Sequence, residues 1–153
     1  MANEIANLVL SAIMSSSKDT GLGVGKDVVS IATLGMNKTG AGIKYYHSDG
    51  NLGDPEVLVL NNGSIEDPFG DAITFLTLHA IYIKNNTGAE LQVGAGATPL
   101  NLFGDKVNDT FEMVNGSIFM YLNESGLTIG ADDTLTITGS AGAADIIIIG
   151  STS

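Results

Sequence analysis

The side chains that most often do chemistry are sparse in this sequence. It contains two histidines, His47 and His79, and no cysteine. Neither histidine has a second ligand at a metal-binding spacing such as His-x-His, and no acidic residue stands beside His79. The lack of cysteine excludes disulfides, a Cys-based zinc site and a thiol nucleophile. We therefore expect both histidines to be structural or surface residues.

Two groups of carboxylates are candidates for acid–base chemistry or for a metal site. Asp132 and Asp133 are adjacent, so in a strand they would point to opposite faces, which suits a turn better than a paired acid and base. Glu66, Asp67 and Asp71 surround a Pro-Phe-Gly bend and offer the hard oxygens that calcium takes. No Asp-x-Asp-x-Asn-Gly loop supports calcium, so we predict charged loop residues and no metal.

The glycine-rich segment before Lys26 resembles a phosphate-binding loop but does not fit the pattern. The Walker motif has four residues between its first glycine and the Gly-Lys pair, followed by Ser or Thr. Here position 20 is threonine, and Asp27 follows Gly25-Lys26. No serine lies in a Gly-x-Ser-x-Gly nucleophile elbow either. We predict no catalytic residue, no cofactor and no enzymatic activity.

The charge balance restricts the possible partners. The chain has 17 acidic residues, six lysines and no arginine, which gives a formal net charge of -11. Such a chain is repelled by nucleic acids and by anionic membrane surfaces, and it lacks the residue that most often binds phosphate and guanine. No apolar run is long enough for a transmembrane helix, and Glu4 stands where a signal peptide would carry positive charge. We predict no nucleic-acid partner and no membrane partner.

The elements that must position these side chains are predicted to be strands. The longest β-like run, residues 72–86, is apolar on both faces, and so is Ile146–Ile149, which favours two central strands. The turn Asn115-Gly116 indicates a hairpin between 110–114 and 117–122. Further short strands are expected at 28–34, 43–47, 57–60, 90–93, 127–129 and 134–138. Turns every 8 to 12 residues and no helical patterns between strands indicate an all-β sandwich or barrel.

The N-terminal segment carries the one helical pattern. Residues 4–14 place Ile5, Leu8, Val9 and Ile13 on one helical face, and residues 15–27 have the composition of a flexible linker. A helix this short is marginal alone in water, so its apolar face requires a docking surface in its own domain or in a neighbouring subunit. The alternative is an extended arm that engages a partner. We expect a helix or arm with a linker over 1–27 and a β-domain over 28–153.

Residues 57–150 also carry a resemblance to a known family. It rests on Asp67-x-Phe69-Gly70, Thr74-Phe75, His79-Ala80-Ile81-Tyr82-Ile83-Lys84-Asn85, Leu91-x-Val93-Gly94, Asn115-Gly116, Asp133-Thr134-Leu135-x-Ile137 and Asp145-Ile146-Ile147-Ile148-Ile149-Gly150. This series resembles small β-sandwich structural proteins from the virion-assembly modules of tailed bacteriophages. Such proteins decorate or cement capsids, often as trimers with jelly-roll-like folds. The first 56 residues do not match, and the family offers no catalytic residues to transfer.

The resemblance implies a non-enzymatic virion structural protein with a single jelly-roll-like β-sandwich of about 8–10 short strands. The leading hypothesis is a head decoration or cement protein on the capsid exterior, bound to the outer face of the shell. Its partners would be the major capsid protein or other virion proteins, and further copies of itself, with a trimer favoured. Ile5, Leu8, Val9 and Ile13 are the predicted partner-binding residues.

Two alternatives remain open from the sequence. One is a tail or receptor-binding component of the virion. The other, less favoured, is a carbohydrate-binding β-sandwich module. With no tryptophan in the chain, only Tyr45, Tyr46, Tyr82 and Tyr121 could stack on a sugar.

Overall fold

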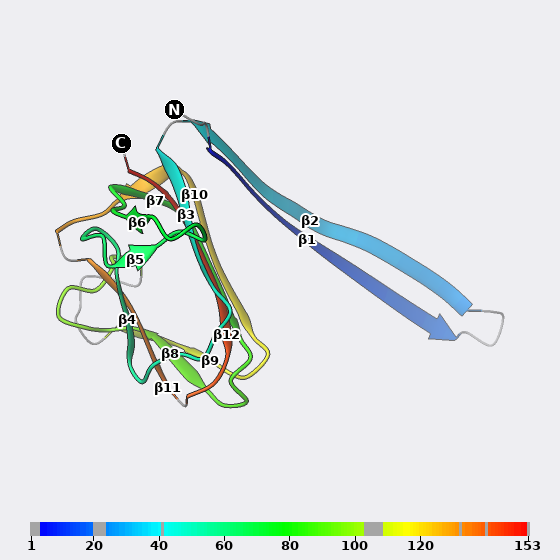
Figure 1. Ribbon diagram of the computed structural model, residues 1–153. Helices are drawn as coiled ribbons and strands as arrows, with labels where there is room; N and C mark the ends of the chain where they lie inside the picture. Colours follow the sequence, from blue (N-terminus) through cyan, green and yellow to red (C-terminus); the bar gives the residue numbers. More distant parts are fainter. Residues whose placement is uncertain are drawn as a thin grey trace.

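The protein is an all-β molecule with a long hairpin beside a β-sandwich (Figure 1). The computed structural model describes residues 4–19, 24–40, 42–102, 109–131, 133–139 and 141–152. Twelve strands and no helix occur in these ranges. The predicted all-β fold class is therefore confirmed.

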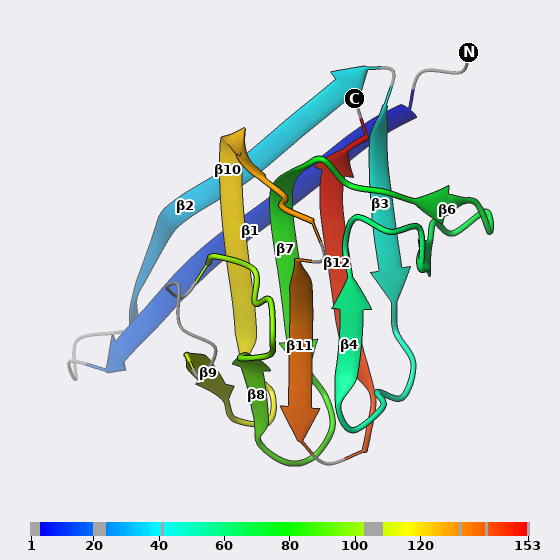
Figure 2. The same ribbon diagram turned by 90° about the vertical axis from the view of Figure 1, so that its left-hand side faces the viewer.

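Eight strands form two four-stranded antiparallel sheets that face each other (Figure 2). The first, here named the β7 sheet, has the order β10-β7-β12-β3 and consists of β3 (Ile43–Ser48), β7 (Thr77–Asn85), β10 (Ile118–Thr128) and β12 (Ala144–Ser151). The second, the β8 sheet, has the order β4-β11-β8-β9 and consists of β4 (Glu56–Val59), β8 (Leu91–Gly94), β9 (Thr110–Met113) and β11 (Thr134–Gly139). The chain crosses between the sheets in the order of a jelly roll, as expected.

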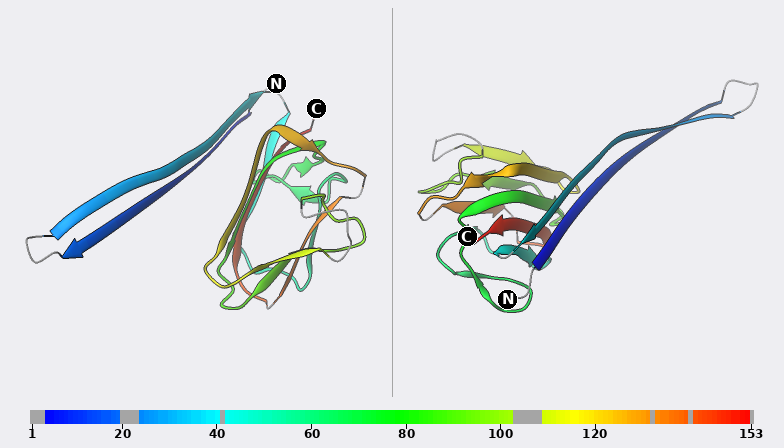
Figure 3. Two further views of the ribbon diagram at one scale, coloured as in Figure 1. Left: turned by 180° about the vertical axis from the view of Figure 1, so that it is seen from behind. Right: turned by 90° about the horizontal axis from the view of Figure 1, so that it is seen from above.

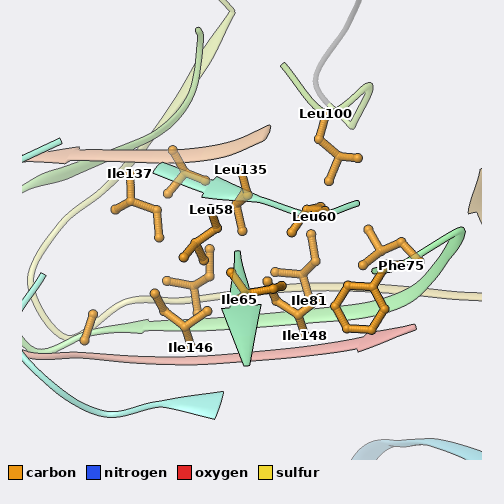
Figure 4. Packing of buried hydrophobic residues seen from close by; sticks show 14 of the residues in the cluster. Leu58, Leu60, Ile65, Phe75, Ile81, Leu100, Leu135, Ile137, Ile146 and Ile148 are labelled. Carbon is orange, nitrogen blue, oxygen red and sulfur yellow. The ribbon is translucent and has the colours of Figure 1, made fainter. Parts of the chain in front are cut away.

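The main core fills the space between the two sheets (Figure 4). Because side chains alternate along a strand, Ile146 and Ile148 of β12 point into this core and are fully buried. Ile81 and Ile83 of β7 lie beside them in register. The predicted strand at Ile146–Ile149 is confirmed, and it pairs directly with β7.

The long apolar run over residues 72–86 is not one continuous strand. Ala72–Ile73 (β6) pairs with Ile65–Glu66 (β5) in a small separate sheet, and β7 begins only at Thr77. Between them, the Phe75 amide donates to the Leu60 carbonyl at 2.8 Å, and the Phe75 ring is fully buried. The prediction of an uninterrupted strand is wrong because the chain bends there to place this ring in the core.

The predicted hairpin over 110–122 is also wrong. The Asn115-Gly116 turn exists, with a positive φ of 83° at Gly116, but β9 pairs with β8 and β10 pairs with β7. The turn therefore joins the two sheets instead of two paired strands. A hydrogen bond of 2.7 Å from the Gly116 amide to the Asn85 carbonyl holds it against the end of β7. Each strand thereby becomes part of a four-stranded sheet, which a two-stranded hairpin alone cannot provide.

The N-terminal segment forms an antiparallel hairpin, which we name the arm. It consists of β1 (Glu4–Asp19) and β2 (Val24–Gly40), paired from Glu4↔Gly40 to Asp19↔Val24 with a register shift at Ala12/Ile13. The arm leaves the sandwich next to β3 and extends away from it (Figure 3). The helix predicted over 4–14 is wrong, and the alternative of an extended arm fits the observed structure.

The arm also changes the expected organisation of the first 42 residues. Most of the predicted linker at 15–27 belongs to β1 or β2, and residues 20–23 lie outside the described residues. The strand predicted at 28–34 is part of β2, so it belongs to the arm and not to the sandwich. The predicted boundary after Asp27 therefore falls inside β2, and the sandwich strands begin at Ile43.

Candidate interaction surfaces

The two histidines occupy different settings. His79 is buried, and its Nδ1 lies 3.3 Å from the backbone oxygen of Asn123, in a bulge of β10. His47 is exposed on β3, opposite Ile147 of β12. Within the described ranges, no three His, Cys, Asp or Glu side chains gather in a group that could hold a metal ion. His79 therefore has the surroundings of a structural histidine.

The acidic cluster around the Pro-Phe-Gly bend is centred on Asp67. Its side chain is only 2% exposed, and Oδ2 accepts a hydrogen bond of 3.0 Å from Lys44 Nζ. Oδ1 accepts from the backbone amides of Phe69 and Asp71, each at 2.9 Å. Both carboxylate oxygens of Asp67 are therefore bound by donors of the protein itself.

These contacts determine the charge state of Asp67. Burial of the carboxyl on its own raises its pKa. The hydrogen bonds from Asp71, Lys44 and Phe69, together with the positive charge of Lys44, outweigh burial, so the pKa of Asp67 lies below its ordinary value. Asp67 is ionised at neutral pH and fastens the bend to β3.

The anchored bend presents one aromatic ring to solvent. The Phe69 side chain is 78% exposed, although its own amide is fixed by Asp67. Rigid exposed aromatic side chains are the residues that most often anchor protein interfaces. Phe69 is therefore a candidate contact residue that the sequence pattern alone did not single out.

A second apolar cluster lies on the side of the β7 sheet that faces away from the main core, which we name the outer face. Ile43, Ala80 and Ile149 are buried there, and Tyr45, Leu122 and Ile147 pack around them. These residues come from all four strands of the sheet and are brought together by the register, with Ile149 paired to both Tyr45 and Ala80. A sandwich sheet normally has a polar outer surface, so this second cluster is unusual.

The corresponding surface of the β8 sheet is more polar. On the side opposite Leu135, Ile137 and Met113 of the core, its strands carry Thr134, Thr138, Gln92 and Glu112, together with the buried Thr136. Val57 is an exposed apolar residue there, at 48%. The two sheets therefore differ in kind, and only the β7 sheet is strongly apolar on both faces.

The four tyrosines do not form an open stacking platform. Tyr46 and Tyr121 pack against the main core, and Tyr45 belongs to the outer face of the β7 sheet. Tyr82 is partly buried, and its pKa is raised by burial and by the negative charge of Asp145. None of the four is fully exposed, which gives the carbohydrate-binding alternative no support.

The predicted partner-binding residues all lie in β1 of the arm. In a strand, positions 5, 9 and 13 share one face, and position 8 belongs to the other. The single face expected for Ile5, Leu8, Val9 and Ile13 therefore does not form. The arm instead has apolar residue types at positions of both faces, including Leu8 and Leu10 on the second.

No family model, curated protein or solved structure matches this chain. The described part of the chain has no helix long and apolar enough to cross a membrane. Three candidate interaction surfaces remain: the arm, the outer face of the β7 sheet and the Phe69 bend. Sequence reasoning proposed the first and did not propose the other two. A signal for the outer face was present, because four consecutive isoleucines must supply both faces of β12.

Proposed function

We propose that the protein is a non-enzymatic virion structural protein, most specifically a decoration or cement protein on the outer face of a phage head. The observation that carries the proposal is the arm. Each of its strands has 16 or 17 residues, so it extends for about 50 Å at the usual rise of a strand. Such a projection suits a subunit that holds its neighbours in an assembly.

The physical reason is that a two-stranded hairpin is marginal on its own in water. A hairpin with apolar residue types on both faces gains stability only when another surface covers it. In a shell, neighbouring subunits are available to do so. Jelly rolls also occur in lectins and cupins, so the fold by itself does not select this role.

The distribution of charge supports a position on the exterior. Residues 1–40 contain three lysines and three acidic residues, whereas residues 41–153 contain three lysines and 14 acidic residues. The formal charge of -11 is therefore carried entirely by the part that includes the sandwich. A negative sandwich is repelled by packaged nucleic acid and keeps decorated particles apart.

The test is cryo-electron microscopy of virions, combined with quantitative mass spectrometry of their proteins. A cement protein is expected as ordered density on the shell, at close to one copy per capsid subunit. A tail or receptor-binding component would be found in few copies at the tail. Virions that contain no ordered copy of this chain would overturn the proposal.

A further inference from the structure

The outer face of the β7 sheet is apolar but is not covered by another described layer of the sandwich. Ala80 and Ile149 are almost fully buried at its centre, yet Tyr45, Leu122 and Ile147 around them are only partly buried. The arm is on the same side of the sandwich as this face but diverges from it (Figures 1 and 3). Among the described residues, no further strand layer lies over the face. An apolar sheet face left in this state is a typical protein-binding surface.

The arm is longer than the sheet from which it extends. It extends for about 50 Å, whereas β10, the longest strand of the β7 sheet, has 11 residues and spans about 35 Å. A single β7 sheet, of the same copy or of another, therefore covers only part of the arm. Because the arm points away from its own outer face, it can reach the outer face of a second copy without folding back (Figures 1 and 3).

The distribution of charge favours contact between the arm of one copy and the sandwich of another. Two sandwiches that each carry the full charge of -11 repel one another when they approach directly. The arm has no net formal charge, so it can approach the sandwich of another copy without this penalty. The outer face itself is apolar over its centre, and the charged residues Lys84 and Asp145, which are opposite each other in the register, lie toward one end of the sheet.

We propose that the arm of one copy of this chain packs across the outer face of the β7 sheet of a second copy. The contact covers Tyr45, Leu122 and Ile147 of one subunit and one face of the hairpin of the other. The inference goes beyond the proposed function, because it concerns only copies of this chain and holds wherever the protein acts. Its test uses purified protein without capsids, so its outcome is independent of the virion experiment.

The first experiment measures the mass of the full-length protein by light scattering over a range of concentrations. The wild type is expected to form an oligomer. Ile147→Lys places a charge in the centre of the outer face and should weaken association by at least about 30-fold. Tyr45→Ala, which removes contact area without adding charge, should weaken it in the same direction, and circular dichroism verifies that both variants are folded.

The matched control is Val57→Lys, which adds the same charge at an exposed apolar position on the opposite sheet. It should leave the oligomer unchanged. A wild type that stays monomeric at every concentration would overturn the proposal. Equal dissociation by Val57→Lys would overturn it as well, because the contact would not then be specific to the β7 sheet.

The second experiment distinguishes arm exchange from a contact between two outer faces. The double variant Leu8→Lys/Val9→Lys introduces charge at positions on both faces of β1 and should also be monomeric. Mixed with Ile147→Lys, it should regain a dimer, because each mixture then contains one intact arm and one intact outer face. If the arm variant stays oligomeric by itself, or if the mixture stays monomeric, the arm is not the occupant.

Discussion

The arm and the sandwich are built from the same kind of element, yet they obtain stability in different ways. Strands of the sandwich pair with neighbours and also bury one face against the opposite sheet, as Ile81 and Ile148 do. Strands of the arm pair only with each other. The sandwich therefore contains its own core, whereas the described pairing of the arm's strands is with each other.

The β7 sheet lies between these two extremes. Its inner face belongs to the main core, and its outer face carries a smaller cluster around Ala80 and Ile149. The outer face of the β7 sheet is therefore suited to a further layer, whereas the more polar face of the β8 sheet is suited to solvent. The following predictions test this distinction on single residues, from the largest expected effect to the smallest.

The two faces of β12 should respond differently to the same substitution. Ile148→Ala removes a fully buried side chain from the main core and should lower the free energy of unfolding by about 4 kcal/mol. Ile147→Ala, one residue earlier on the outer face, should cost about 1 kcal/mol in the monomer because that side chain is only partly buried. Urea denaturation measures both values. Equal losses would mean that the faces do not differ as described.

Close packing around Gly150, at the end of the isoleucine run, should require glycine at this position. A Cβ at Gly150 would lie 2.5 Å from the Phe75 ring and 2.5 Å from the Thr77 carbonyl oxygen. Gly150→Ala should therefore destabilise the sandwich by about 3 kcal/mol. Gly50→Ala is the control, because a Cβ there meets nothing within 4 Å. Thermal unfolding of the two variants should separate clearly, and similar melting temperatures would contradict the tight contact.

The Asp67 anchor should give the sandwich a measurable pH dependence. Asp67→Asn keeps an acceptor for the amides of Phe69 and Asp71 but loses the ion pair with Lys44, at a cost of about 2 kcal/mol at pH 7. Because folding lowers the pKa of Asp67, its stabilisation is fully present above the ordinary value of 3.8 and is lost as the pH falls toward the lower folded value.

The difference in stability between wild type and Asp67→Asn should therefore shrink as the pH falls below about 3.8. Chemical denaturation at a series of pH values measures this difference. Asp71→Asn serves as the control, since its exposed side chain carries no such bond. A difference that stays constant down to about pH 2 would show that the ion pair does not contribute.

Removal of residues 1–40 should have the smallest effect on the sandwich. The shortened chain keeps Gly42, whose carbonyl accepts from the Thr152 amide at 2.8 Å, and it retains both sheets. The unfolding free energy of the monomer should change by less than about 1 kcal/mol. Calorimetry measures it, and unfolding of the shortened chain would show that the arm belongs to the core of its own subunit.

The N-terminal segment shows why part of the fold could not be predicted. Ile5, Val9 and Ile13 are four residues apart, a spacing that matches one face of a helix and also one face of a strand. Leu8 favoured the helix, but the pairing of β1 with β2 supplies hydrogen bonds along 16 residues. That pairing depends on residues up to Gly40, which local periodicity does not include. Whether these residues bind a partner stays a prediction.

The sequence by itself determined the class of fold and much of the strand pattern. The strand predicted at 134–138 is confirmed, with Leu135 and Ile137 in the core. The apolar runs over 72–86 and 146–149 predicted two central strands, and the first of these is a central strand only over Thr77–Asn85. These predictions succeed because burial of one face or of both faces leaves a period that can be recognised locally.

Only the tertiary structure decided which strands pair and which surfaces remain open. It separated β9 from β10, placed Phe75 in the core between two strands, and assembled Ile43, Ala80 and Ile149 from three strands into one outer cluster. The physical reason is that register and cover depend on contacts between residues far apart in the chain. Hydrophobic periodicity indicates that a face is apolar, but the partner that covers it is set by the whole assembly of strands.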